Sequence, residues 1–183
     1  MSTPASAHRP HAQQRSFLGF RLGERHYALP VELIAQIIEM VSITPITQLD
    51  ACLEGVINVR GEVAPVLQLS CRLGQPKIRL QLHTPIILLH AGPYQVGWIV
   101  DEALSVFQLM RSQIRPSSDA ALRHAQEANL IVSELVHAER VWLLLDVQRL
   151  LTEVVPLVSR AVSMAQQQGT QARRVRDANG AGA

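Results

Sequence analysis

The chain has 183 residues, of which 48% are hydrophobic and 17% are charged. This length favours one domain or two small subdomains that share a core, and the composition excludes wholesale disorder, because disordered chains are poor in apolar residues. The formal net charge of +2 divides into +2 over residues 1–16, −3 over residues 17–158 and +3 over residues 159–183. Since only the tails are basic and aromatic residues are few, we expect no nucleic-acid binding.

The N-terminal part of the chain predicts a β-hairpin followed by a further strand. Residues alternate in character from Phe17 to Leu22 and again from Arg25 to Leu29, with a turn signal at Gly23-Glu24 between them. Apolar spacing from Val31 onward predicts a short helical turn, and the β-branched content then predicts a strand over residues 36–42.

A second strand pair is expected in the middle of the chain. A brief helix over residues 51–54 is predicted to precede strands from Val56 to Arg60 and from Val63 to Leu69, with a turn at Gly61-Glu62. Pro65 lacks a backbone N–H, so we expect its strand to lie at a sheet edge or Pro65 to lie at a strand end.

The second half of the chain again predicts short strands separated by turns, and it ends in a helical pattern. Strands are predicted over Pro85–His90, Gln95–Asp101, Ala103–Leu109, Leu130–Val136 and Val141–Val147, with the polar segment Pro116–Asn129 before the last two. About nine short strands without long crossover helices indicate antiparallel sheets closed into barrels or sandwiches, and they disfavour a Rossmann-like fold.

The two ends of the chain differ from its middle. We expect disordered tails over residues 1–15 and 169–183, because these segments have few apolar residues. Residues 152–168 have a broad apolar face and predict a C-terminal helix, which Pro156 should limit to a start at that residue.

No catalytic, metal-binding or cofactor-binding pattern stands out. The seven histidines have no metal-ligand spacing, and no glycine-rich phosphate loop or nucleophile motif is present, so we expect no catalytic residue, metal or cofactor. Cys52 and Cys71 lie 19 positions apart without a CxxC pair, which indicates neither zinc nor a disulfide framework and favours a reducing cytoplasm. The start of the chain lacks the apolar region of a secretory signal, and no apolar run reaches bilayer length.

The segment from Gly55 to Leu67 is the most distinctive part of the sequence. Strand alternation directs Arg60 away from the core at a turn, where its planar donor group is displayed outward. Two interpretations are open: a docking role for Arg60, or an exposed arginine paired with Glu62. Spacing alone favours the second.

Four motifs occur in order and carry a resemblance to a known family. They are Phe17-Leu-Gly-Phe-Arg-Leu-Gly-Glu-Arg-His-Tyr-Ala-Leu-Pro, Gly55-Val-Ile-Asn-Val-Arg-Gly with Pro65-Val, Gly97-Trp-Ile-Val-Asp and Leu143-Leu-Leu-Asp. In these motifs the chain resembles the CheW-like chemotaxis coupling proteins. The resemblance implies an all-β fold over residues 16–151, with two SH3-like five-stranded β-barrel subdomains packed on a shared apolar core.

The resemblance also implies a role without chemistry. Family members are cytoplasmic adaptors, peripheral to membrane receptor arrays, that couple the tip of a methyl-accepting chemoreceptor to the regulatory domain of a CheA-type histidine kinase. This implies a function in chemotaxis or in type IV pilus twitching. Two alternatives remain: a CheW-like regulator that competes for receptor or kinase without activating it, and a small β-barrel enzyme.

Site residues follow from the resemblance by position. Asn58, Arg60 and Gly61 match the family's Asn-x-Arg-Gly, and Ile34 matches an apolar position of the same contact, so the resemblance implies receptor binding at these four residues. Gln36, Gln68 and Ser70 stand where the family commonly has charges, and we expect them to alter a partner surface, including the kinase interface.

Overall fold

The computed structural model describes residues 14–46, 50–116 and 129–180. The elements in chain order are β1 (Gln14–Leu22), β2 (Arg25–Pro30), a 3-10 turn (Val31–Leu33), β3 (Ile34–Glu39), β4 (Leu53–Val59), β5 (Glu62–Gln68), α1 (Leu69–Arg72), β6 (Pro85–Ala91), β7 (Tyr94–Ile99), β8 (Glu102–Met110), a 3-10 turn (Arg111–Gln113), β9 (Ile114–Pro116), β10 (Ile131–His137), β11 (Arg140–Leu145) and α3 (Val147–Gly180).

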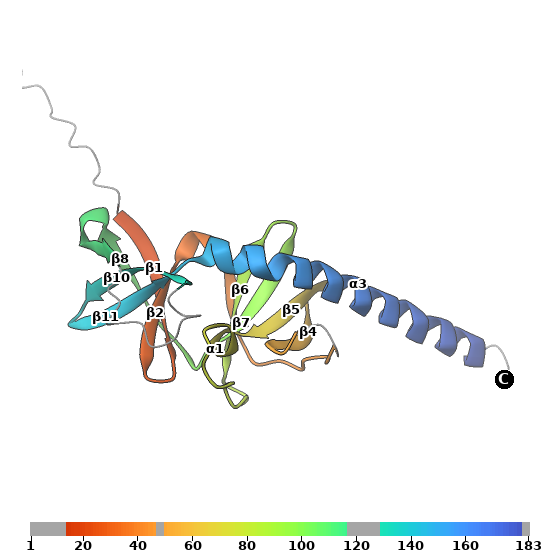
Figure 1. The fold of residues 1–183 in the computed structure, drawn as a ribbon. Coiled ribbons are helices and arrows are strands. Elements are labelled where there is room, and N and C mark those ends of the chain that lie inside the picture. Colours follow the sequence, from red (N-terminus) through yellow and green to blue (C-terminus); the bar gives the residue numbers. More distant parts are fainter. Residues whose placement is uncertain (1–13, 47–49, 117–128, 181–183) are drawn as a thin grey trace, which may run out of the picture.

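The strands form two sheets, each curved into a barrel (Figure 1). The terminal barrel has the strand order β8-β1-β2-β11-β10-β9, and the central barrel has the order β3-β6-β7-β5-β4. Most neighbours are antiparallel, but β11 runs parallel to β2, and β5 runs parallel to β7. The central barrel is therefore inserted, in sequence, between the first and last strands of the terminal barrel.

Three apolar clusters account for the packing. The terminal barrel encloses Phe17, Phe107 and Trp142 among others, and the central barrel encloses a separate aliphatic cluster that includes Ile57 and Ile86. A third and larger cluster joins the facing sides of both barrels to α3. The expected all-β fold, with two SH3-like barrels on a shared apolar core, is confirmed, although the terminal sheet has six strands because the short β9 adds to it.

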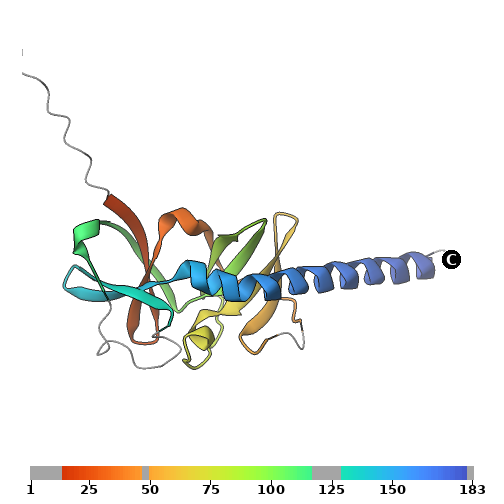
Figure 2. The same cartoon turned by 45° about the horizontal axis from the view of Figure 1, so that its top comes forward.

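Helix α3 begins where the two barrels meet, lies along the central barrel and then continues beyond it (Figure 2). Asp146 begins the helix, because its carboxylate accepts a hydrogen bond from the backbone N–H of Arg149 at 3.0 Å. The helix contains Pro156, and buried residues lie on both sides of it, including Leu150 before it and Val158 after it.

The predicted start at Pro156 is therefore wrong, and the helix also continues to Gly180, into the segment expected to be disordered from residue 169. A proline inside a helix costs about 3 kcal/mol, whereas each fully buried Leu or Val stabilises the fold by roughly 1.5–3 kcal/mol. Several such side chains on both sides of Pro156 outweigh one lost hydrogen bond.

Most predicted strands are confirmed, and three details differ from the prediction. Residues 51–54 do not form a helix, since residues 51 and 52 form a turn and β4 begins at Leu53. β3 begins two residues before the predicted strand 36–42 and ends at Glu39. Pro65 lies in β5, an interior strand, where it is tolerated because pairing with β7 begins only at Val66.

Some predictions lie outside the described residues. These are the structure of residues 1–13 and of most of the polar segment Pro116–Asn129. Within the described ranges, no helix combines the length and the hydrophobicity that a membrane span requires.

Candidate functional site

The turn between β4 and β5 has the tight geometry of a two-residue hairpin. Val59 pairs with Glu62, so Arg60 and Gly61 alone connect the strands, with φ angles of 53° and 94°. Positive φ at both positions is the pattern of a type I′ turn, whose twist matches that of the strands it joins. The side-chain oxygen of Asn58 accepts a hydrogen bond from the backbone N–H of Gly61 at 2.8 Å. The Asn-x-Arg-Gly motif thus builds a rigid turn with Arg60 at its tip.

Arg60 occupies a conformation that arginine rarely adopts. The first position of such a turn favours Asn or Gly, and a left-handed backbone costs other residues roughly 1–2 kcal/mol. The Arg60 residue is exposed, and no hydrogen bond or ion pair joins its side chain to any residue that the structure describes. The alternative of pairing with Glu62 is accordingly not seen, and the guanidinium is available to a partner.

A hollow of about 430 Å³ opens beside Arg60 at the end of the central barrel. Its walls come from β3, β4, β5, β6, β7 and the turn, and its lining residues are Ala35, Gln36, Val59, Arg60, Glu62, His90 and Gln95. Gln36, which we assigned to a different partner contact, therefore shares this hollow with Arg60. The lining residues are mostly polar, and they include one permanent cation, Arg60, and one carboxylate, Glu62.

His90 and Gln95 were not among the predicted site residues. Sheet pairing brings them together, because His90 of β6 lies opposite Gln95 of β7. The side-chain oxygen of Gln95 is buried and has no hydrogen-bond partner among the described residues, while other atoms of Gln95 line the hollow. The sequence could have indicated that His90 and Gln95 are neighbours, because a turn is predicted after His90 and residues that flank a hairpin turn lie opposite each other.

A second hollow, of about 460 Å³, adjoins the first. It lies between α3 and the β6–β7 turn, and its lining residues are His90, Ala91, Gly92, Gln148, Leu151, Thr152, Val155 and Pro156. His90 lines both hollows, so a continuous surface runs from the Arg60 turn to the N-terminal half of α3.

The other predicted receptor residues lie close to this surface. Gly61 is exposed in the turn itself, and Asn58 is exposed on β4, two residues before Arg60. Ile34 begins β3, where it is half-buried and packs against the shared core beside Leu89 instead of lining the hollow. Three of the four residues thus lie at or beside one turn, and the fourth, Ile34, lies at the start of β3, the strand that contains Gln36.

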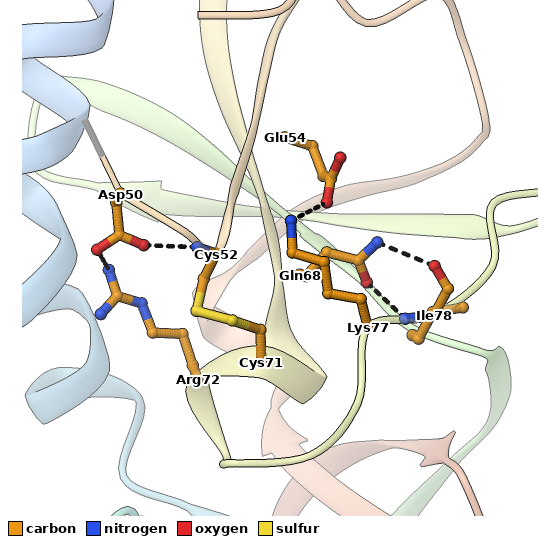
Figure 3. The surroundings of a disulfide bond; sticks show 8 residues. All are labelled: Asp50, Cys52, Glu54, Gln68, Cys71, Arg72, Lys77 and Ile78. Carbon is orange, nitrogen blue, oxygen red and sulfur yellow. Dashed lines mark hydrogen bonds and ion pairs between the residues drawn. A yellow bond between two sulfur atoms is a disulfide. The ribbon is translucent and has the colours of Figure 1, made fainter. Parts of the chain in front are cut away.

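Gln68 and Ser70 do not form a partner surface, and that prediction is wrong. Their exposed fractions are 1% and 2%. The Gln68 side-chain amide forms hydrogen bonds with both the backbone N–H and the carbonyl of Ile78, each at 3.1 Å (Figure 3). The physical reason is that β5 ends inside the shared core and passes directly into α1, where a charged side chain would have to be buried without water.

The two cysteines are joined, contrary to expectation. Cys52 and Cys71 form a disulfide with a Cα separation of 5.5 Å, at the end of the β4–β5 hairpin opposite the Arg60 turn (Figure 3). Antiparallel pairing places the Cys52 carbonyl 2.8 Å from the backbone N of Gln68, and α1 then turns Cys71 back toward Cys52. A separation of 19 positions contains no local sign of this arrangement.

Comparisons with known proteins agree with the geometry. The CheW-like domain model matches residues 16–155. The chemotaxis protein CheW of Klebsiella aerogenes is 30% identical over 138 residues, which are 75% of this chain and 82% of that protein. The protein PilI of Pseudomonas aeruginosa is 25% identical over 134 residues, which are 72% of each chain.

The solved structure of the scaffolding protein TtCheW from Thermoanaerobacter tengcongensis has the same fold, with a TM-score of 0.66 and 23% identity over 73% of this chain and 90% of that one. The family match includes both barrels and the start of α3. The chain belongs to the CheW-like domain family.

Proposed function

We propose that this protein is a non-enzymatic, cytoplasmic adaptor of a bacterial chemosensory array. It binds the cytoplasmic tip of a methyl-accepting chemoreceptor and the regulatory domain of a CheA-type histidine kinase. Its relatives include proteins named for chemotaxis and the protein PilI, which supports a role in chemotaxis or in type IV pilus twitching. The family match over most of the chain supports the coupling role.

The observation that carries the receptor contact is the conformation of Arg60. A left-handed arginine with an unpaired guanidinium is a local cost that Asn at the same position would avoid. Strain of this kind is concentrated at functional sites, where the side chain is needed for an external contact. Arg60 is therefore the residue that we assign to the receptor.

The chemistry of the hollow indicates what the receptor presents. The guanidinium can hold a carboxylate through two parallel hydrogen bonds, and Gln36 and Gln95 can add neutral hydrogen bonds beside it. Glu62 also lines the hollow, and its negative charge disfavours a second acid there. We therefore expect one acidic side chain of the receptor at Arg60, with polar uncharged neighbours facing Gln36 and Gln95.

The position of Gln36 changes its assignment. Gln36 shares a hollow with Arg60, so we propose that it contributes to the receptor contact instead of a separate kinase interface. Gln68 and Ser70 take no part in either contact because both are buried.

The test compares charge reversals in the two barrels. Arg60→Glu should remove binding to a receptor tip fragment, Arg60→Ala should weaken it, and neither should change binding to the isolated kinase regulatory domain. Arg115→Glu reverses an exposed arginine on β9 of the terminal barrel and serves as the matched control. Unchanged receptor affinity in folded Arg60→Glu protein would contradict the assignment.

Kinase assays with receptor then separate the two candidate roles. An adaptor raises receptor-dependent phosphorylation by the kinase, and Arg60→Glu abolishes that rise. A competing regulator lowers phosphorylation as its concentration increases, and this outcome would replace the adaptor proposal.

A further inference from the structure

The disulfide lies away from the Arg60 turn, to which the receptor contact is assigned. Cys52 immediately precedes β4 and Cys71 lies in α1, so the bond closes the base of the β4–β5 hairpin (Figure 3). The Arg60 turn is at the far end of the same hairpin. Any role of this bond therefore concerns the hairpin base and the elements packed against it.

Noncovalent contacts hold both cysteine backbones in place independently of the bond. One carboxylate oxygen of Asp50 accepts a hydrogen bond from the backbone N–H of Cys52 at 2.8 Å. The other carboxylate oxygen lies 3.0 Å from the Arg72 guanidinium, directly after Cys71 in the chain. Asp50 thus bridges the two segments, and two separated thiols would remain neighbours. A high effective concentration of one thiol at the other favours re-formation of the bond.

The site is accessible to a small reactant from one side. Cys52 is 9% exposed, whereas Cys71 is half-buried and lies on α1, whose first two residues are buried and whose last two are half-buried. Arg72, which follows Cys71 in the chain, is paired with Asp50 at 3.0 Å and thereby ties the Cys71 segment to the Cys52 segment. Attack by a small thiolate at Cys71 therefore needs no unfolding of the barrel.

We propose that Cys52 and Cys71 form an exchangeable thiol–disulfide site that is oxidised and reduced while the protein stays folded. In the reducing direction a small thiolate attacks the Cys71 sulfur, the S–S bond breaks and Cys52 leaves as a thiolate. A second small thiol then resolves the mixed disulfide, which yields two protein thiols and one small-molecule disulfide. Oxidation is the reverse exchange with a small disulfide such as oxidised glutathione, which takes up the two electrons.

The consequence of exchange is transmitted to α3. Leu53, Leu67 and Leu69 flank the disulfide in the chain and belong to the apolar cluster that holds Val154 and Val158 of α3. A covalent link at the hairpin base restricts the opening of this cluster, so oxidised protein should hold α3 more tightly than reduced protein. In a reducing compartment a disulfide of this kind is typically transient and redox-sensing.

The first experiment is a redox titration of the full chain. The protein is equilibrated in defined ratios of reduced to oxidised glutathione, quenched in acid and alkylated, and the two forms are counted by mass spectrometry. We expect complete and reversible interconversion with an unchanged far-ultraviolet circular dichroism spectrum, and faster amide exchange in α3 of the reduced form. Failure of oxidised glutathione to form the bond in folded protein, or unfolding on reduction, would overturn the proposal.

Variants of the bridging ion pair test the geometric argument. Asp50→Ala and Arg72→Gln should each shift the equilibrium toward the dithiol by roughly three- to tenfold, because the segments are held together less firmly. Glu54→Gln is the matched control, since Glu54 lies two residues after Cys52 in β4 and forms a 2.7 Å ion pair with Lys77 that involves neither Asp50 nor Arg72. Equal shifts in the variants and the control would refute the role of Asp50. These measurements use neither receptor nor kinase, so their failure would leave the adaptor proposal untouched.

Discussion

Replacing Arg60 with Asn should stabilise the protein and weaken its receptor binding at the same time. Arg60 has a φ of 53° at the first position of a type I′ turn, where Asn is the favoured residue. Relief of the left-handed conformation should raise the free energy of unfolding by about 0.5–1 kcal/mol. For a chain of this size, that gain corresponds to a rise in Tm of about 1–4 °C.

The affinity should change in the opposite direction. A charge-assisted hydrogen bond to a carboxylate contributes about 1.5–3 kcal/mol, so its loss should weaken receptor binding by about ten- to a hundredfold. Thermal melting and titration with a receptor tip fragment, on the same preparation, measure both quantities.

A turn in the other barrel provides the matched control. Ala138 and Glu139 connect β10 and β11, because His137 pairs with Arg140, and Ala138 has a φ of 48° at the same turn position as Arg60. Ala138→Asn should give a similar stabilisation with unchanged receptor affinity. A less stable Arg60→Asn protein would refute the argument about the turn, and undiminished affinity would refute the docking role.

Three further predictions concern packing, pH and the chain end. Gly19→Ala should lower the free energy of unfolding by about 1–3 kcal/mol in urea titrations, because the added Cβ would overlap the Trp142 ring; a neutral result would mean that the ring moves aside. Burial, followed by the charge of Arg140, lowers the pKa of the His26 imidazole. The contribution of His26 to the free energy of unfolding should therefore be complete above the unfolded-state pKa of 6.5 and should decline as the pH falls through the lower folded-state pKa. His26→Gln should flatten that pH dependence in melts between pH 5 and 8, and an unchanged slope would exclude His26 as its source. Deletion of residues 169–183 should change Tm by less than about 2 °C, because the buried residues of α3 that the structure describes, up to Val162, all remain, and a larger fall would show that the end of the helix is docked.

The sequence predicts those parts of the fold that depend on neighbours in the chain. Alternation on both sides of Gly23-Glu24 and on both sides of residues 91–93 is local information, and both hairpins are observed. The predictions of an edge strand at Pro65 and of a helix start at Pro156 rest on local rules, and tertiary packing overrides both. The interior position of Pro65 depends on where β7 begins to pair, and the helix through Pro156 depends on a core contributed by both barrels.

The same distinction applies to the site. Alternation was sufficient to direct Arg60 outward, and the predicted turn could have identified His90 and Gln95 as neighbours. Nothing local shows that Gln68 is buried or that Cys52 meets Cys71, because both facts follow from the way in which β5 and α1 enter the shared core. From the sequence alone, polar residues at such a strand end cannot be distinguished from surface residues.

The interleaved strand order has a consequence for the order of events during synthesis. The central barrel needs only residues 34–99, so it can close while the ribosome is still producing the rest of the chain. In the terminal barrel, β1 and β2 can pair with each other at once, but the outer edge of β1 stays unpaired until β8 emerges, and the outer edge of β2 until β11 emerges. The reason is that Phe17 pairs with Phe107 and Tyr27 with Leu143. During this interval the nascent hairpin presents the apolar residues Phe17 and Phe20 without their final partners. A chaperone that acts on this protein should therefore bind its N-terminal hairpin, and should be released once residue 145 has left the exit tunnel.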